Sequence, residues 1–329
     1  MNASQQVLEA GTQLANRYNV EFVLGQGGMG AVYLARDLAH NGQPVALKEM
    51  RVQTADAKSQ RQAVEQFHQE ARFLYELDHP NLVKVSDFFF ENGRYYLIMD
   101  YIQGKSLADL LKEQSEPFNV SQVLEWAVQL ADVLAYLHGQ DPPILFRDMK
   151  PSNILLDSSR KLRLIDFGIA RSYTDGSVTA TFIRGMGSAD YCPLEQCSGG
   201  TDPRSDIYSL GATLFHLLTL QVPPRAAELA SGNKPVPSPR RWNSNIPPSL
   251  EDLIVTMLAV RKNHRCESIV YVQEALAKII LSVEQRRAPK RTRGVGRARQ
   301  NRHWAALAGL TIGVLGLLVW LAFQMLPHP

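Results

Sequence analysis

The first part of the chain is a series of short, largely hydrophobic runs that alternate with turns. These runs are rich in β-branched and aromatic residues and are bounded by turn residues, a pattern typical of antiparallel strands. We therefore expect five strands, at 19–25, 30–37, 44–50, 84–93 and 94–102. One helical stretch, at 58–77, interrupts this series. This part of the chain should form a small β-rich lobe.

Beyond Gly104 the apolar residues recur at helical spacing over longer stretches. The clearest are 121–138 and 205–220, and clusters of proline and glycine mark loops between them. The stretch 223–248, rich in Pro, Ser and Asn, is expected to be a long ordered excursion of a helical lobe. The chain is thus predicted to be an α+β protein with an extension at 1–17, a β-rich lobe at about 18–102 and a helical lobe at about 103–282.

A long apolar segment lies near the C-terminus. Residues 304–326 contain no charged side chain, and roughly 20 apolar residues suffice to cross a bilayer core. A buried core helix is the alternative, but such helices rarely run this long without a polar face. Trp304 and Trp320 suit the two membrane interfaces. We predict one transmembrane helix at 304–326, followed by a tail at 327–329.

Positive charge is concentrated directly before that segment. The formal net charge is only +3, yet residues 286–303 carry seven arginines, one lysine and no acid. Such a run could be a nucleic-acid patch, a localisation signal or a solvated linker. Because it abuts an apolar span, we interpret 283–303 as a basic juxtamembrane linker that keeps the two lobes in the cytoplasm, and we expect no nucleic-acid partner. Glycines at 309, 313 and 316 would permit a homodimer through the membrane helix.

A glycine-rich sequence, G-Q-G-G-M-G-A-V at 25–32, lies between the first two predicted strands. Glycine lets the backbone approach phosphate oxygens and offer its N–H groups. A purely structural hairpin and a dinucleotide-binding turn are alternatives. The dinucleotide turn should run from a strand into a helix, whereas both flanks here look like strands.

Lys48 ends the run V-A-L-K within the next predicted strand, where its charge would neutralise phosphates below the glycine loop if an acid held it in place. On the following predicted helix, Glu70 is favoured as that acid over Glu65 and Glu76. It lies four residues before Leu74, which is spaced to face the core.

Two motifs further along carry the remaining candidate chemistry. The run F-R-D-M-K-P-S-N at 146–153 places Asp148, Lys150 and Asn153 in one loop, and I-D-F-G follows with Asp166. Phosphoryl transfer needs positioned metal ions, a hydroxyl oriented in line and positive charge near the moving group. These residues supply all three.

In this order and spacing, the motifs resemble those of eukaryotic-type (Hanks-type) serine/threonine protein kinases of the membrane-anchored kind found in bacteria. The resemblance extends over the two predicted lobes. It implies the bilobal kinase fold, ATP as phosphoryl donor, Mg²⁺ with Mn²⁺ as an alternative, and protein substrates modified on serine or threonine hydroxyls.

The resemblance also implies roles for individual residues. Asp148 would accept or orient the proton of the substrate hydroxyl, and Lys150 would stabilise the transferring phosphate. Lys48 would contact the α and β phosphates, anchored by Glu70. The metal ligands would be Asn153 and Asp166. The nucleotide pocket would comprise Leu24, Gly25, Gln26, Gly27, Gly28, Met29, Gly30, Val32, Ala46, Lys48, Met99, Asp100, Ile102 and Leu155.

The segment between Asp166 and Glu195 resembles an activation segment. We expect autophosphorylation at Thr179 or Thr181, with the planar cation of Arg147 binding the phosphate. Two structural contacts are implied as well: Glu195 should pair with Arg265, and Asp206 should brace the backbone of the catalytic loop.

Three positions depart from the family pattern: Phe146 replaces histidine, Leu194 replaces proline, and Ser188 replaces threonine. None removes a charged or metal-binding atom, so activity is expected, although Leu194 lies near the expected peptide groove. The main rival is a catalytically silent pseudokinase scaffold, but the lysine, the aspartates and the glycines are all retained. A kinase of small molecules would generally lack a docking segment such as 187–196.

Overall fold

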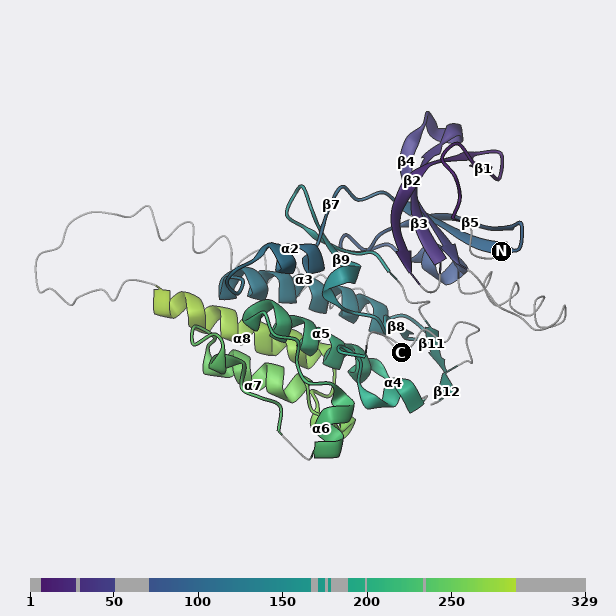
Figure 1. Ribbon diagram of the computed structural model, residues 1–329. Coiled ribbons are helices and arrows are strands. Elements are labelled where there is room, and N and C mark those ends of the chain that lie inside the picture. The colour runs from purple at the N-terminus through teal and green to yellow at the C-terminus, as the bar shows by residue number, and fades with distance from the viewer. Residues whose placement is uncertain are drawn as a thin grey trace, which may run out of the picture. The chain divides into compact units, whose positions relative to one another are not determined.

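The computed structural model describes residues 7–27, 30–50, 71–166, 171–174, 177–178, 189–198, 200–232 and 235–287. Figure 1 shows one lobe built from a sheet and another built mainly from helices with short strands beside them, so the expected bilobal architecture is confirmed. Within these ranges, no helix combines the length and apolar character that a membrane span requires. The predicted transmembrane segment, 304–326, lies outside them.

The N-lobe is an antiparallel six-stranded sheet. Its spatial order is β1 (Gln13–Leu14), β2 (Tyr18–Gly27), β3 (Gly30–Asp37), β4 (Gln43–Met50), β6 (Arg94–Asp100) and β5 (Val85–Glu91). The five predicted strands are present, and β1 is an additional strand from the N-terminal extension. A 3₁₀ turn, η2 (Leu38–His40), joins β3 to β4. Of the helix predicted at 58–77, only 71–77 is described, and 71–76 is helical.

Side-chain alternation divides this sheet into two apolar faces. On β4, Val45 and Leu47 join an outer cluster, whereas Ala46 and Met50 join the core shared with the helical lobe. Lys48 has the same parity as Ala46 and Met50, so it projects from the inner face. The strand pattern therefore determines which side of the sheet carries the candidate chemistry.

The C-lobe is built from seven described α-helices and three short 3₁₀ helices. They are α2 (Leu107–Glu113), α3 (Val120–His138), η3 (Pro151–Asn153), α4 (Leu194–Ser198), α5 (Pro203–Thr219), α6 (Ala226–Gly232), η4 (Pro239–Arg241), α7 (Pro248–Met257), η5 (Lys262–His264) and α8 (Ile269–Arg287). The helices predicted at 121–138 and 205–220 correspond to α3 and α5. A capping box formed by Asp202 and Ser205 starts α5, with Pro203 in its first turn.

Two small sheets hold the loop between the lobes. One contains β10 (Leu162–Leu164), β9 (Ile154–Asp157) and β7 (Gly104–Ser106), and the other contains β12 (Ser177–Val178), β11 (Arg171–Thr174) and β8 (Ile144–Leu145). Because β8 precedes residues 146–153 and β9 follows them, the loop that carries Asp148 is held at both ends.

Candidate active site

Three polar side chains of the loop 146–153 are joined around Asp148. Its Oδ2 accepts a hydrogen bond from Lys150 Nζ at 2.7 Å and another from Asn153 Nδ2 at 2.9 Å. The Asn153 amide also donates to the Asp148 carbonyl oxygen at 2.8 Å. The Asp148 carboxylate is therefore held in one orientation by a cation and an amide.

Lys48 reaches this region from the inner face of β4. Its Nζ forms an ion pair with Asp166 Oδ1, and the two side chains are 17% and 35% exposed. Asp166 comes two residues after β10, so the pair connects the N-lobe sheet with the chain that follows β10. The predicted partner Glu70 lies outside the described residues.

Side chains predicted to line the adenine pocket lie on β4, β6 and neighbouring segments. Ala46 and Met99 face each other in the strand register and are 9% and 5% exposed. Val32 and Ile102 are partly buried against the same core, and Leu155 on β9 is half-buried. Burial raises the pKa of Asp100, the last residue of β6. Apart from Asp100, the side chains predicted to contact adenine are therefore apolar.

The glycines of the loop 25–30 meet different surroundings. A Cβ on Gly25 or Gly27 would meet no atom within 4 Å, whereas a Cβ on Gly30 would lie 2.0 Å from the Glu49 carbonyl oxygen. Gly30 also has a φ of +150°, which disfavours other residues. The fold itself thus requires glycine at 30 but leaves open space at 25 and 27. Gly28 and Met29 lie outside the described residues, while Leu24 and Gln26 are exposed.

Asp206 braces the catalytic loop from the start of α5, as expected. Its fully buried carboxylate accepts from the backbone N–H groups of Phe146 at 2.9 Å and Arg147 at 2.7 Å. His138 Nε2 lies 2.9 Å from the same carboxylate. Sequence reasoning missed His138, because a histidine at the end of a helix ordinarily reads as a solvated residue. Phe146 is fully buried in the core, in keeping with its expected packing role.

Arg147, the candidate phosphate-binding arginine, is turned towards the start of α5. Its guanidinium donates to Thr201 Oγ1 at 2.6 Å, and its buried Nε has no hydrogen-bond partner within the described part of the chain. Burial lowers the pKa of this side chain. Thr179 and Thr181 lie outside the described residues.

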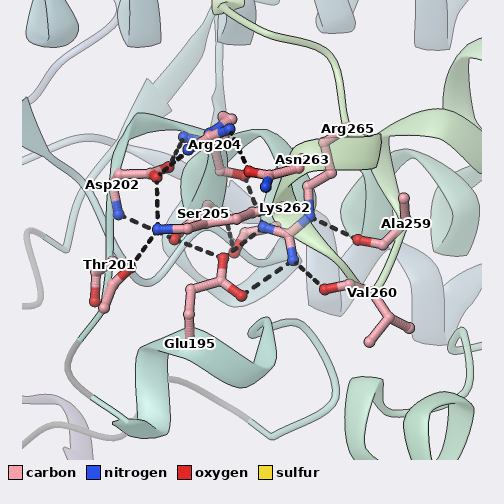
Figure 2. Close-up of polar contacts among 12 residues, drawn as sticks. Glu195, Thr201, Asp202, Arg204, Ser205, Ala259, Val260, Lys262, Asn263 and Arg265 are labelled. Carbon is pink, nitrogen blue, oxygen red and sulfur yellow. Dashed lines mark hydrogen bonds and ion pairs between the residues drawn. The ribbon is translucent and has the colours of Figure 1, made fainter.

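The expected ion pair between Glu195 and Arg265 is present in the helical lobe (Figure 2). The Arg265 side chain is fully buried, and it donates to Glu195 Oε2 at 3.1 Å and to the carbonyl oxygens of Ala259 and Val260 at 2.7 and 3.0 Å. Ser205 Oγ also donates to Glu195, at 2.9 Å. Burial works against ionisation of Glu195, but these bonds, led by that from Arg265, leave its pKa below its usual value.

The two-lobe fold, the inward lysine of β4 paired to Asp166 and the constrained Asp148 are the arrangement expected of a protein kinase domain. Residues 18–278 match the protein kinase domain family. The chain belongs to the protein kinase family, and its relatives place it among the bacterial serine/threonine kinases, which confirms the predicted resemblance.

Two curated relatives and one solved structure illustrate the similarity. The chain is 34% identical over 264 residues to serine/threonine-protein kinase PrkC of Bacillus subtilis, covering 78% of this chain and 40% of that protein. It is 33% identical over 279 residues to PknB of Mycolicibacterium smegmatis, covering 81% and 43%. The kinase domain of Mycobacterium tuberculosis PknI superposes with a TM-score of 0.64 at 25% identity, covering 84% of this chain and all of that one. The chain spans about two fifths of the length of these curated relatives.

Proposed function

We propose that the chain transfers the γ-phosphate of ATP to serine and threonine hydroxyls of proteins. The observation that carries this proposal is that Lys48 pairs with Asp166, while the backbone N–H of the adjacent Ile165 donates to the carbonyl oxygen of Asn153, in the loop that holds Asp148, at 3.0 Å. A cation that binds phosphate, an oxygen ligand for metal and an oriented carboxylate are the groups that phosphoryl transfer requires.

The donor set fits a magnesium ion. Mg²⁺ prefers oxygen ligands and is usually bound by one or two carboxylates together with substrate phosphates. Asp166 offers a carboxylate. Asn153 uses its amide nitrogen towards Asp148, which leaves its Oδ1 as the ligand atom. When bound, ATP would supply the electrophilic phosphoryl group, and Mg²⁺ would neutralise negative charge on its phosphates.

Some residues of the chain position the nucleotide phosphates, and others orient the substrate hydroxyl and accept its proton. Lys48 binds the nucleotide phosphates and keeps them over the catalytic loop. Asp148 accepts or orients the proton of the substrate hydroxyl, because Lys150 and Asn153 hold its carboxylate in one direction. Lys150, beside that carboxylate, stabilises negative charge on the moving phosphoryl group.

The direct test is to incubate the chain with γ-labelled ATP, magnesium and a protein substrate, and then to identify the labelled amino acids. We expect phosphoserine or phosphothreonine that disappears when the metal is chelated. ATP binding without any transfer would instead support the pseudokinase scaffold.

The glycine loop should separate ATP binding from folding. Gly27→Ala should lower ATP affinity on the order of tenfold, about 1.4 kcal/mol, because its methyl group occupies space that phosphates approach. Its melting temperature should stay near that of the wild type, since a Cβ there meets no atom within 4 Å. Gly30→Ala should unfold at a clearly lower temperature, because its Cβ collides with β4. Unchanged ATP affinity in Gly27→Ala would argue against a phosphate loop.

Regulation by phosphorylation of the activation segment is a further part of the proposal. A phosphate on Thr179 or Thr181 would offer oxygen acceptors to the Arg147 guanidinium, whose buried Nε lacks a partner within the described ranges. We expect mass spectrometry of active protein to find phosphate on one of these two threonines. Active protein without phosphate on the segment would remove this hypothesis.

Membrane attachment through 304–326 and cytoplasmic lobes are proposed from the sequence pattern alone. Each basic residue near an anionic leaflet contributes about 1 kcal/mol, so the run 286–302 should orient the kinase while the apolar segment anchors it. Deleting 286–302 should leave the protein in the membrane fraction after cell fractionation. A soluble protein after that deletion alone would contradict the proposed anchor.

A further inference from the structure

A buried carboxylate lies on the outer face of the N-lobe sheet, directly after Lys48 in sequence. Glu49 is 1% exposed, and strand alternation places it on the side opposite Lys48. Its cross-strand neighbours, Ala31 on β3 and Tyr96 on β6, both belong to the outer apolar cluster. Burying a charge among apolar side chains is costly unless it is paired and hydrogen-bonded.

Two partners of Glu49 come from the two strands that flank β4. Arg94 NH1, at the start of β6, donates to Glu49 Oε2 at 2.9 Å, and the Tyr33 hydroxyl, from β3, donates to the same oxygen at 3.0 Å. The Arg94 side chain is itself only 17% exposed. Directional bonds therefore tie β4 to its two neighbours immediately behind Lys48, in addition to the backbone ladder.

The N-terminal segment 7–15 contacts Tyr33 and packs on the outer apolar cluster of the sheet. The backbone N–H of Leu8 donates to the Tyr33 hydroxyl at 3.1 Å, and Val7 and Leu8 pack on the outer cluster. Further along, Leu14 is 2% exposed within that cluster, and the N–H of Ala15 donates to Glu91 Oε2 at 2.8 Å. The segment is thus bound to the sheet at both of its ends.

We propose that Glu49, Arg94 and Tyr33 are positioning residues for Lys48. In this proposal the segment 7–15 covers the Glu49–Arg94 ion pair on the outer face of the sheet. A buried ion pair is a weak source of stability, because a well-packed apolar pair of similar volume often does as well or better. The directional bonds of Glu49 to Arg94 and Tyr33 nevertheless fix the position of β4 relative to β3 and β6. They thereby fix where the Lys48 ammonium lies. The inference rests on the proposed function of Lys48 in binding the nucleotide phosphates.

The decisive variant removes both charges together. The 329-residue chain carrying Glu49→Leu and Arg94→Met loses both members of this ion pair at once, so its melting temperature should stay near that of the wild type. Its KM for ATP should nevertheless rise by about tenfold or more, because small misplacements of a binding group are costly. The KM for the protein substrate should not change. Glu21→Gln, which breaks a partly exposed pair with Arg36 on the same sheet, is the matched control and should behave like the wild type.

Tyr33→Phe provides an independent measurement with little risk to folding. It deletes only the hydroxyl that links Leu8 to Glu49, and it should raise the KM for ATP in the same direction. Arg94→Lys, which keeps the charge, should retain more ATP affinity than Arg94→Met. A wild-type KM for ATP in the double variant or in Tyr33→Phe would overturn the positioning role. If the wild type itself shows no ATP-dependent transfer, the proposed function fails instead.

Discussion

Replacing Asp148 by asparagine should lower the turnover of phosphoryl transfer by about 10²- to 10⁴-fold, the range typical of a lost general acid–base group. Asparagine keeps the shape of the side chain and one oxygen acceptor for Lys150 or Asn153, but it cannot take up the hydroxyl proton. ATP affinity should change little, because the proposed nucleotide contacts come from the glycine loop, the apolar side chains of β4 and β6, and Lys48. Single-turnover transfer and nucleotide titration, measured on the same preparation, test both statements.

Asp252→Asn is the matched control, because it makes the same chemical change at an exposed position on α7. It should retain wild-type turnover and stability. An Asp148→Asn protein that transfers phosphate at the wild-type rate would exclude the role proposed for this carboxylate. A fall in ATP affinity as large as the fall in turnover would place Asp148 in nucleotide binding instead.

Replacing Arg265 by methionine should be the most destabilising of the substitutions considered. It leaves the Glu195 carboxylate buried without its cation, and breaking a buried pair in this way costs about 3–5 kcal/mol. The carbonyl oxygens of Ala259 and Val260 lose a donor as well. For a domain of this size the melting temperature should fall by roughly 10 °C, as measured by calorimetry or circular dichroism.

Arg225→Met is the control, because Arg225 also pairs with an acid in the helical lobe, but at the surface. Exposed pairs contribute about 0–1 kcal/mol, so its melting temperature should hardly change. The double variant Arg265→Met with Glu195→Met should recover part of the loss. An Arg265→Met protein as stable as Arg225→Met would show that the pair is not a stability element.

The pH dependence of stability should follow from the lowered pKa of Glu195. Burial opposes ionisation of this carboxyl, and the bond from Arg265 more than offsets that effect. The contribution of the pair is therefore fully present above the ordinary pKa of glutamate and is lost as the pH falls through the lowered folded-state value. Wild type and Arg265→Met should accordingly converge in stability at acid pH. A stability difference that stays constant into strong acid would contradict this account.

Much of the fold could be predicted because its periodic signals are local. The strand at 30–37 was predicted with its observed bounds, since a run rich in β-forming residues is bounded by turn residues on both sides. The helix α3 differs from its prediction by one residue at its start, where Asn119 caps it. The strand β1 was missed because two residues cannot show a periodicity. It exists because the N-terminal extension finds an open edge beside β2.

In the candidate site, too, the features that depend on neighbours in the chain could be predicted from the sequence, whereas the long-range contacts could not. The sequence alone determined the order and spacing of its motifs and the alternation that puts Lys48 and Glu49 on opposite faces of β4. Only the tertiary structure decided that Lys48 meets Asp166, 118 residues away, that His138 lies on Asp206, and that Arg94 and Tyr33 converge on Glu49. The physical reason is that periodicity and turn chemistry act between neighbours in the chain, whereas these contacts depend on how separate strands and helices pack around a shared core.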